Sequence, residues 1–165
     1  MKLNMDNRKR IVVKVGTSTL TYPSGLMNLR KTERLVRCMA DIQNSGKACV
    51  LVSSGAVSCG LAKIGLVGKR LTTEEKQAAA AVGQCELMFI YDKFFGEYHQ
   101  NVAQVLLTAD VTARENSRTN VVNTFSELLS MGIIPIVNEN DTVAVDELEG
   151  RNFGDNDTLA ALVAC

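Results

Sequence analysis

Four short clusters of small polar and acidic residues hold the side chains of this 165-residue sequence that could do chemistry. They are Gly16-Thr17-Ser18 with Lys14 just before it, Ser53-Ser54-Gly55-Ala56, Asn138-Glu139-Asn140-Asp141, and Gly154-Asp155-Asn156-Asp157. The first cluster suits a phosphate, because glycine and hydroxyl residues leave backbone N–H groups available to an anion and Lys14 adds a positive charge. An ordinary β-turn beside a strand-end lysine is the alternative interpretation.

The remaining clusters suit the two ends of an amino acid. Ser53-Ser54-Gly55 is typical of a helix N-cap, and the N–H groups of a helix N-terminus also favour a carboxylate. The cluster at 138–141 continues directly from an apolar run, and its carboxylates and amides could bind an ammonium group or organise Mg²⁺ around a phosphate. A solvated acidic loop is the simpler explanation for the acids that follow it, Asp146, Glu147 and Glu149. Together these clusters predict an amino-acid pocket.

Alternating strands and helices are expected to position the clusters. Apolar β-branched runs predict strands, and apolar residues at helical spacing predict the helices between them. The predicted strands are Ile11–Val15, Ala48–Val52, Val102–Leu107 and Ile133–Val137. The predicted helices run from Leu29 to Ile42, from a capping box at Thr72 and Glu75 through Val82, Cys85, Phe89 and Phe95, from Asn120 to Met131, and over Thr158–Cys165.

This order of elements predicts an α/β fold with parallel strands and right-handed crossovers. In open α/β sheets, ligands bind outside the carboxyl ends of the strands. Three of the clusters follow predicted strands, and the fourth opens the last helical stretch. We therefore expect all four clusters at one edge of one sheet.

Composition excludes several classes of protein. Eighteen Lys and Arg residues balance eighteen Asp and Glu residues, so nothing calls for nucleic acid or an anionic membrane surface. The first ten residues contain no apolar stretch, so we expect no signal peptide, and the longest apolar runs are too short to span a bilayer. The five scattered cysteines, with no C-x-x-C, indicate a reducing cytosol rather than disulfides or a zinc site.

Several residues that resemble chemical motifs have simpler explanations. The stretch 65–69 is no Walker A loop, because four residues must separate its glycines. His99, the single histidine, is expected on the surface, and Cys59 is expected to be a small packing residue. The run Ala78–Ala81 with Gly83 predicts a close approach between helices.

At the four clusters the sequence closely resembles the glutamate 5-kinases of the amino-acid kinase family. The order of 138–141 and 154–157 behind Ser54-Gly55-Ala56 is the specific part of the resemblance, which extends from about Arg10 to Cys165. The matching segments are Val12–Ser18, Val52–Val57, Ala80-Ala81-Val82-Gly83-Gln84, Val137–Asp141 and Phe153–Asp157.

The resemblance implies a three-layer α/β/α sandwich with a mainly parallel sheet. Residues 1–165 would form one domain, the amino-terminal substrate-binding lobe, without the carboxyl-terminal nucleotide-binding lobe. The implied reaction is transfer of the ATP γ-phosphoryl group to the side-chain carboxylate of L-glutamate, giving L-glutamyl 5-phosphate in the first step of proline biosynthesis. It also implies Mg²⁺ with ATP, a homo-oligomer and a cytoplasmic location, and leaves feedback inhibition by proline open. A catalytically inactive glutamate-binding module and a sister amino-acid kinase remain the alternatives.

The resemblance also implies a role for each matched residue. Lys14 would stabilise charge on the transferring phosphate, and Asp157, with Asp155 as a second candidate, would orient the lysines around the reaction. Gly16 and Thr17, with Lys14, would approach the phosphates of ATP. No residue is assigned to a metal. The residues expected to bind glutamate are Ser54, Gly55, Asn138, Asn156 and Asp141, the last of these facing its ammonium group.

Overall fold

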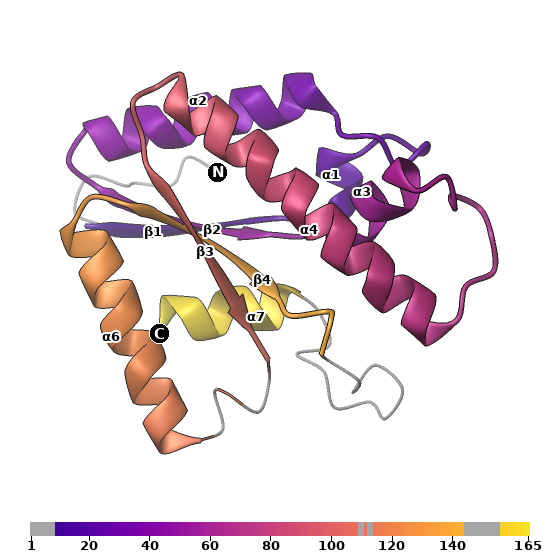
Figure 1. The fold of residues 1–165 in the computed structure, drawn as a ribbon. Coiled ribbons are helices and arrows are strands. Elements are labelled where there is room, and N and C mark those ends of the chain that lie inside the picture. Colours follow the sequence, from indigo (N-terminus) through magenta and orange to yellow (C-terminus); the bar gives the residue numbers. More distant parts are fainter. Residues whose placement is uncertain (1–8, 109–110, 112–113, 144–155) are drawn as a thin grey trace.

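Four parallel strands form one sheet in the computed structural model, which describes residues 9–108, 111, 114–143 and 156–165 (Figure 1). The strands lie in the order β1-β2-β4-β3. β1 pairs with β2, β2 with β4, and β4 with β3, and every pairing is parallel. The strand bounds are β1 Arg10–Val15, β2 Ala48–Ser53, β3 Val102–Leu107 and β4 Ile134–Glu139.

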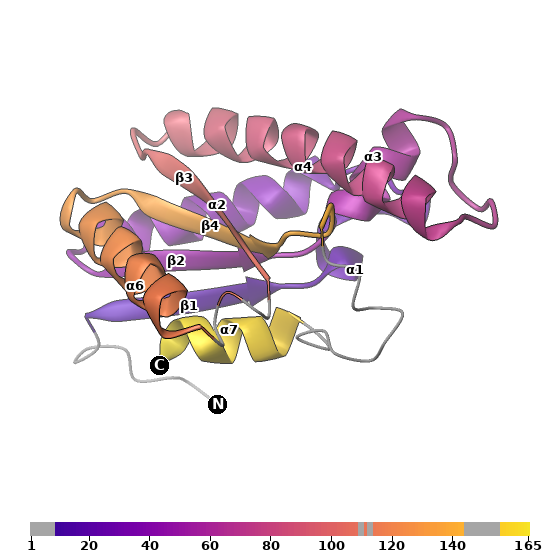
Figure 2. The same cartoon turned by 60° about the horizontal axis from the view of Figure 1, so that its bottom comes forward.

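Helices cover both faces of this sheet. α2 (Leu29–Asn44) and α4 (Thr73–Gly96) lie on one face, and α6 (Glu115–Ser130) and α7 (Asn156–Ala164) lie on the other (Figures 1 and 2). Two short helices, α1 (Thr17–Leu20) and α3 (Ala56–Lys63), follow β1 and β2. The predicted α/β class with a parallel sheet between two helical layers is confirmed.

The two faces explain why β2 is almost entirely apolar. Cys49 and Leu51 pack into the core beneath α2 and α4, whereas Val50 and Val52 pack into the core against α6 and α7. Because successive side chains of a strand point to opposite faces, a strand buried on both sides has no solvated position. The apolar run of the sequence therefore marks a central strand.

The chain leaves two neighbouring strands toward opposite faces. After β2 it continues into α3 and α4, while the next described helix after β4 is α7, on the other face. β2 and β4 are hydrogen-bonded neighbours, with Val52 opposite Val137. Such a reversal between adjacent strands leaves a crevice at their carboxyl ends, where open α/β sheets bind ligands. This topology therefore predicts that a ligand binds at the carboxyl ends of β2 and β4, a place that we call the crevice.

The element predictions succeed for the strands and differ in places for the helices. Each predicted strand is present and shifts by no more than two residues at either end. The helix predicted at 120–131 begins at Glu115, because its first turn is polar and carries no apolar periodicity. The four-residue α1 was not predicted, since one turn is too short to show any periodicity.

The long helix α4 begins at its predicted capping box. Thr72 Oγ1 accepts a hydrogen bond from the Glu75 N–H at 3.2 Å, and Glu75 Oε2 accepts one from the Thr72 N–H at 2.9 Å. The side of α4 that is buried differs from the predicted stripe. Phe89 is 63% exposed, and the buried face contains Gln84, Leu87, Tyr91 and Phe95. A polar residue, Gln84, thus lies on the core-facing side.

α3 and α4 approach so closely that only glycine fits at the crossing. A Cβ on Gly60 would lie 1.8 Å from the Ala79 carbonyl oxygen. A Cβ on Gly83 would lie 1.7 Å from the Ala56 carbonyl oxygen. The predicted close packing at Ala78–Ala81 and Gly83 is confirmed, and it fixes the start of α3 against the middle of α4.

We expect Gly83→Ala to lower the free energy of unfolding by roughly 1–3 kcal/mol, because the added methyl group forces α3 and α4 apart. Urea denaturation of the two proteins measures the difference. The matched control is Gly96→Ala on the same helix, where an added Cβ has no neighbour within 4 Å. Because alanine favours helix over glycine, this control should not lose stability. A Gly83→Ala protein as stable as the parent would contradict the close crossing.

Candidate active site

The predicted convergence of polar clusters occurs at the carboxyl ends of β1, β2 and β4. Lys14 and Gly16 come from the end of β1, Ser54 from the end of β2, and Asn138 from β4. The start of α7 brings Asn156 and Asp157 to the same edge. Four separate segments of the chain therefore supply one site.

Lys14 and Asp157 form an ion pair across this edge. Lys14 Nζ lies 2.8 Å from Asp157 Oδ1, with the two side chains 26% and 69% exposed. A pair this exposed contributes only roughly 0–1 kcal/mol to stability, so its main effect is to orient the lysine. A Cβ on Gly16 would lie 3.9 Å from Lys14 Nζ, so the ammonium group lies beside the backbone at Gly16. This places the ammonium group of Lys14 at the start of α1.

The side-chain amide of Asn156 joins three segments. Its Nδ2 donates to the Ser54 hydroxyl, and it reaches the Ser53 carbonyl oxygen and Asn138 Oδ1, each at 3.4 Å. All three acceptors belong to β2, β4 or the residue directly after β2. Asn156 therefore ties the first residue of α7 to the two strands that flank the crevice.

Asn138 continues this network toward α4. It is 3% exposed, and its Nδ2 donates to Gln84 Oε1 at 3.1 Å. In β4, Ile134 and Ile136 point to the α2 and α4 face, and Asn138 follows the same alternation. The face that is apolar along the strand thus becomes polar at its carboxyl end.

A pair of buried hydroxyl groups lies behind Ser54. Ser53 Oγ and the Tyr91 hydroxyl are 2.9 Å apart, and Ser53 Oγ also donates to the Ser54 carbonyl oxygen at 3.1 Å. Because the single Ser53 proton is used in that second bond, Tyr91 is the donor to Ser53. Burial raises the pKa of the Tyr91 hydroxyl, which keeps it a neutral donor. The backbone that carries Ser54 is therefore held from the core of the protein.

Gly55 is the N-cap residue of α3, and no side chain caps this helix. Its φ of +106° lies in the left-handed region that favours glycine. The segment Ser53-Ser54-Gly55 does precede a helix, and Gly55 is its N-cap, but neither serine side chain caps the helix. The Ser54 hydroxyl accepts from Asn156 instead. The turn at Gly55 directs the chain from β2 into α3 and leaves Ser54 at the sheet edge.

Three further predicted site residues are Thr17, Asp141 and Asp155. Thr17 begins α1, and its carbonyl oxygen accepts from the Thr21 N–H at 2.8 Å. Asp141 is half-buried in the turn directly after β4, and the preceding residue, Asn140, donates its N–H to the Leu107 carbonyl oxygen at 2.8 Å. Asp155 lies outside the described residues. Asp141 is thus at the edge of the site, and the prediction for Asp155 stays a prediction.

Ser53 and Gln84 lie within motif segments of the sequence, but no role of its own was predicted for either residue, and Tyr91 was missed. Gln84 and Tyr91 are seven residues apart, a spacing that puts them on one face of a helix. That face is otherwise apolar, so two hydrogen-bonding residues on it could have been recognised as contacts to the strands beneath.

Two residues that resemble chemical groups have no part in this site. Burial, and then the carboxylate of Glu86, raise the pKa of the Cys59 thiol, so it stays protonated and is a poor nucleophile. His99 is exposed just before β3. Both predictions, a packing cysteine and a surface histidine, are confirmed.

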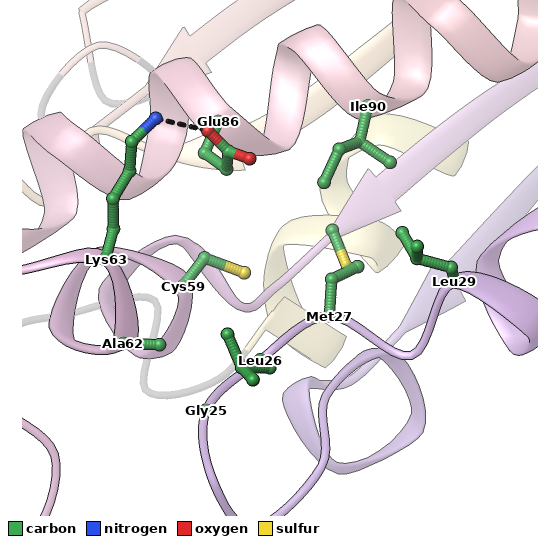
Figure 3. A pocket seen from close by; sticks show the side chains of 9 residues that line it. All are labelled: Gly25, Leu26, Met27, Leu29, Cys59, Ala62, Lys63, Glu86 and Ile90. Carbon is green, nitrogen blue, oxygen red and sulfur yellow. Dashed lines mark hydrogen bonds and ion pairs between the residues drawn. The ribbon is translucent and has the colours of Figure 1, made fainter.

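An apolar pocket of about 380 Å³ lies apart from the polar clusters, between α3, α4 and the segment before α2 (Figure 3). Met27, Leu29 and Ile90 are among its lining residues. Its charged groups are Lys63 and Glu86, which form an ion pair with each other. This lining offers little to a phosphate or an amino acid, so the chemistry belongs at the sheet edge.

The described residues form neither a metal-binding cluster nor a membrane-spanning helix. Within residues 9–108, 111, 114–143 and 156–165, no three His, Cys, Asp or Glu side chains gather closely enough to hold a metal ion. No helix in the same part of the chain is both long and apolar enough to cross a membrane.

The comparison with known families decides the membership of this chain. The sequence pattern of the Amino acid kinase family matches residues 9–165. The chain belongs to the amino acid kinase family. The described fold and the edge of polar residues at the ends of β1, β2 and β4 are thus those of a member of this family.

Curated relatives are similar over the whole chain. The glutamate 5-kinase of Clostridium perfringens is 58% identical over 165 residues, which cover 99% of this chain and 61% of the relative. Those of Listeria monocytogenes and Enterococcus faecalis are 56% and 54% identical, again with 99% of this chain and 60% of the relative covered. The chain spans about 60% of the length of the curated relatives that it matches.

The buried hydroxyl pair gives a first test of the site. Tyr91→Phe and Ser53→Ala are each expected to lower the free energy of unfolding by roughly 1–2 kcal/mol. Ser53→Ala leaves the buried Tyr91 hydroxyl without its acceptor, and Tyr91→Phe removes the donor to Ser53 Oγ. The double variant should lose less than the sum of the two, since neither partner is then left alone. Chemical denaturation of the four proteins gives this coupling. Strictly additive losses would contradict the hydrogen bond.

Proposed function

We propose that this chain forms the part of a glutamate 5-kinase that binds L-glutamate and orients it for phosphoryl transfer from ATP. The observation that carries this proposal is the placement of the Lys14–Asp157 ion pair beside the linked side chains of Ser54, Asn138 and Asn156 at one sheet edge. A cation and a set of neutral hydrogen-bonding groups suit the joining of a phosphate to an amino acid. The name shared by the curated relatives supports the choice of glutamate.

The proposed reaction needs no general base. An oxygen of the glutamate side-chain carboxylate, already ionised at neutral pH, forms a bond to the γ-phosphorus of ATP. The bond from that phosphorus to the bridging oxygen breaks, and ADP leaves with the electron pair. No proton has to be removed from the nucleophile. The reaction therefore does not need a histidine at the site, and the single histidine, His99, lies outside the site clusters. The protein has to align the two reactants and neutralise charge.

The residues of the site then have distinct tasks. Lys14 would stabilise the negative charge on the phosphoryl oxygens, and Asp157, at 2.8 Å, would hold the lysine in place. Gly16 and Thr17, at the start of α1, would approach the phosphates with their backbone. ATP would arrive as its Mg²⁺ complex, so the ion belongs to the substrate. Asp155 stays a second candidate for orienting the lysine.

Glutamate would lie against the ends of β2 and β4. Ser54 and the backbone at Gly55 would face a carboxylate, and Asn138 and Asn156 would hold the chain of the substrate. Asp141, half-buried directly after β4, has the charge to take the ammonium group. A cytoplasmic location, a homo-oligomeric state and sensitivity to proline stay predictions from the resemblance. All five cysteines are free thiols, which is compatible with a reducing compartment.

Calorimetric titration with L-glutamate and an ATP-dependent hydroxamate assay together test the proposal. The assay traps glutamyl 5-phosphate with hydroxylamine in the presence of Mg²⁺. Binding with turnover is the result expected for a working kinase. Binding without turnover favours the alternative of a glutamate-binding module. This alternative is considered because the chain spans only about 60% of the length of its relatives. No binding of glutamate would contradict both.

Two substitutions separate rate from affinity. Lys14→Ala should lower the rate of phosphoryl transfer by roughly 10²–10³-fold with little change in glutamate affinity, because it removes charge stabilisation in the transition state. Asp141→Ala should weaken glutamate binding by roughly tenfold or more, and should abolish the preference for L-glutamate over 2-oxoglutarate, which lacks the ammonium group.

Surface variants of the same kind serve as controls. Lys69→Ala removes an exposed lysine from the loop before α4, and Asp92→Ala removes an exposed carboxylate from α4. Both controls should leave rate and affinity unchanged. An unchanged rate in Lys14→Ala would remove that residue from the mechanism, and unchanged discrimination in Asp141→Ala would remove it from ammonium recognition.

A further inference from the structure

The side chain of Gln84 is buried with half of its amide unsatisfied. Gln84 is 8% exposed, and its Oε1 accepts from Asn138. Its Nε2 is fully buried and has no hydrogen-bond partner within the described protein. A buried donor left unpaired costs roughly 1–3 kcal/mol, and most buried polar groups avoid this loss. An acceptor is therefore missing at this point.

The orientation of the amide chain shows which end of Gln84 is unpaired. The Ser53 carbonyl oxygen can only accept, so the amide of Asn156 must turn its Nδ2 toward it. The same Nδ2 approaches Asn138, so the atom of Asn138 that faces it must be the acceptor Oδ1. The Nδ2 of Asn138 therefore faces Gln84. Gln84 must then present Oε1. Each amide passes its N–H to the next oxygen, and the last N–H₂ belongs to Gln84.

Gln84 lies next to residues of the proposed glutamate site. The residue before it, Gly83, lies against the Ala56 carbonyl oxygen at the start of α3, directly after Gly55. Its own Oε1 contacts Asn138 at the end of β4. Gln84 therefore stands between the turn that carries Ser54 and the strand end that leads to Asp141.

We propose that Gln84 is a further substrate-binding residue whose Nε2 donates to a carboxylate oxygen of the bound amino acid. This inference rests on the proposed function. An amide nitrogen that has only N–H donors left binds an acceptor oxygen. It disfavours an ammonium group, because the hydrogens of the two groups would repel one another. Gln84 thus complements Asp141, because one selects the anionic end and the other the cationic end.

Gln84→Glu is the sharpest variant. It keeps the size of the side chain and an oxygen for Asn138, but replaces the donor with a carboxylate oxygen that repels the substrate. The matched control is Glu86→Gln, the reverse exchange two residues along the same helix, where the side chain contacts Lys63 at the apolar pocket. Calorimetry with L-glutamate should show affinity reduced by roughly tenfold or more for Gln84→Glu and unchanged for Glu86→Gln.

An NMR measurement on the parent chain does not depend on whether the variants fold correctly. The side-chain N–H₂ resonances of Gln84 should shift when L-glutamate is added and stay in place when L-lysine is added. This inference would be overturned if the parent binds glutamate while the Gln84 resonance does not move and Gln84→Glu keeps full affinity. The proposed function would then still stand, and a buried water would be the partner of Nε2. A parent chain that does not bind glutamate would overturn both.

Discussion

The side-chain amide of Asn156 is the constraint on which the candidate site depends. It donates across the ends of β2 and β4 and so holds the first residue of α7 at the crevice. The next residue, Asp157, therefore lies near the end of β1, where it forms an ion pair with Lys14. The same amide, turned by the Ser53 carbonyl oxygen, sets the direction of every hydrogen bond from Asn156 to Gln84.

The architecture explains how such a network comes to be at a sheet edge. Both faces of the sheet are covered, so the interior accepts few polar groups, and those present must be paired. The strands end where the chain departs to opposite faces after β2 and β4, and the crevice between these departures is the place where polar side chains meet. The glycine crossing at Gly60 and Gly83 brings α4 close enough for Gln84 to join them.

The sequence was sufficient for the features that repeat along the chain and insufficient for those that depend on one contact. Apolar runs located each of the four described strands. The ends of these strands located Lys14, Ser54 and Asn138, because parallel strands share an edge. The buried side of α4 was misjudged, since alanine, glycine and glutamine give a weak apolar signal beside an exposed Phe89. The spacing of Gln84 and Tyr91 shows only that they share a helix face. Their particular partners, Asn138 and Ser53, could not be predicted, because each lies on a strand far away in sequence.

The central claim is that an acceptor amino acid binds at the sheet edge around Asn156 rather than in the apolar pocket near Met27. Hydrogen–deuterium exchange of the chain, with and without saturating L-glutamate, tests it most directly. The account predicts slower exchange of backbone N–H groups in residues 53–58, 138–143 and 156–160, with residues 25–29 unchanged. Unchanged exchange at the sheet edge, or protection confined to the segments that line the apolar pocket, would contradict it.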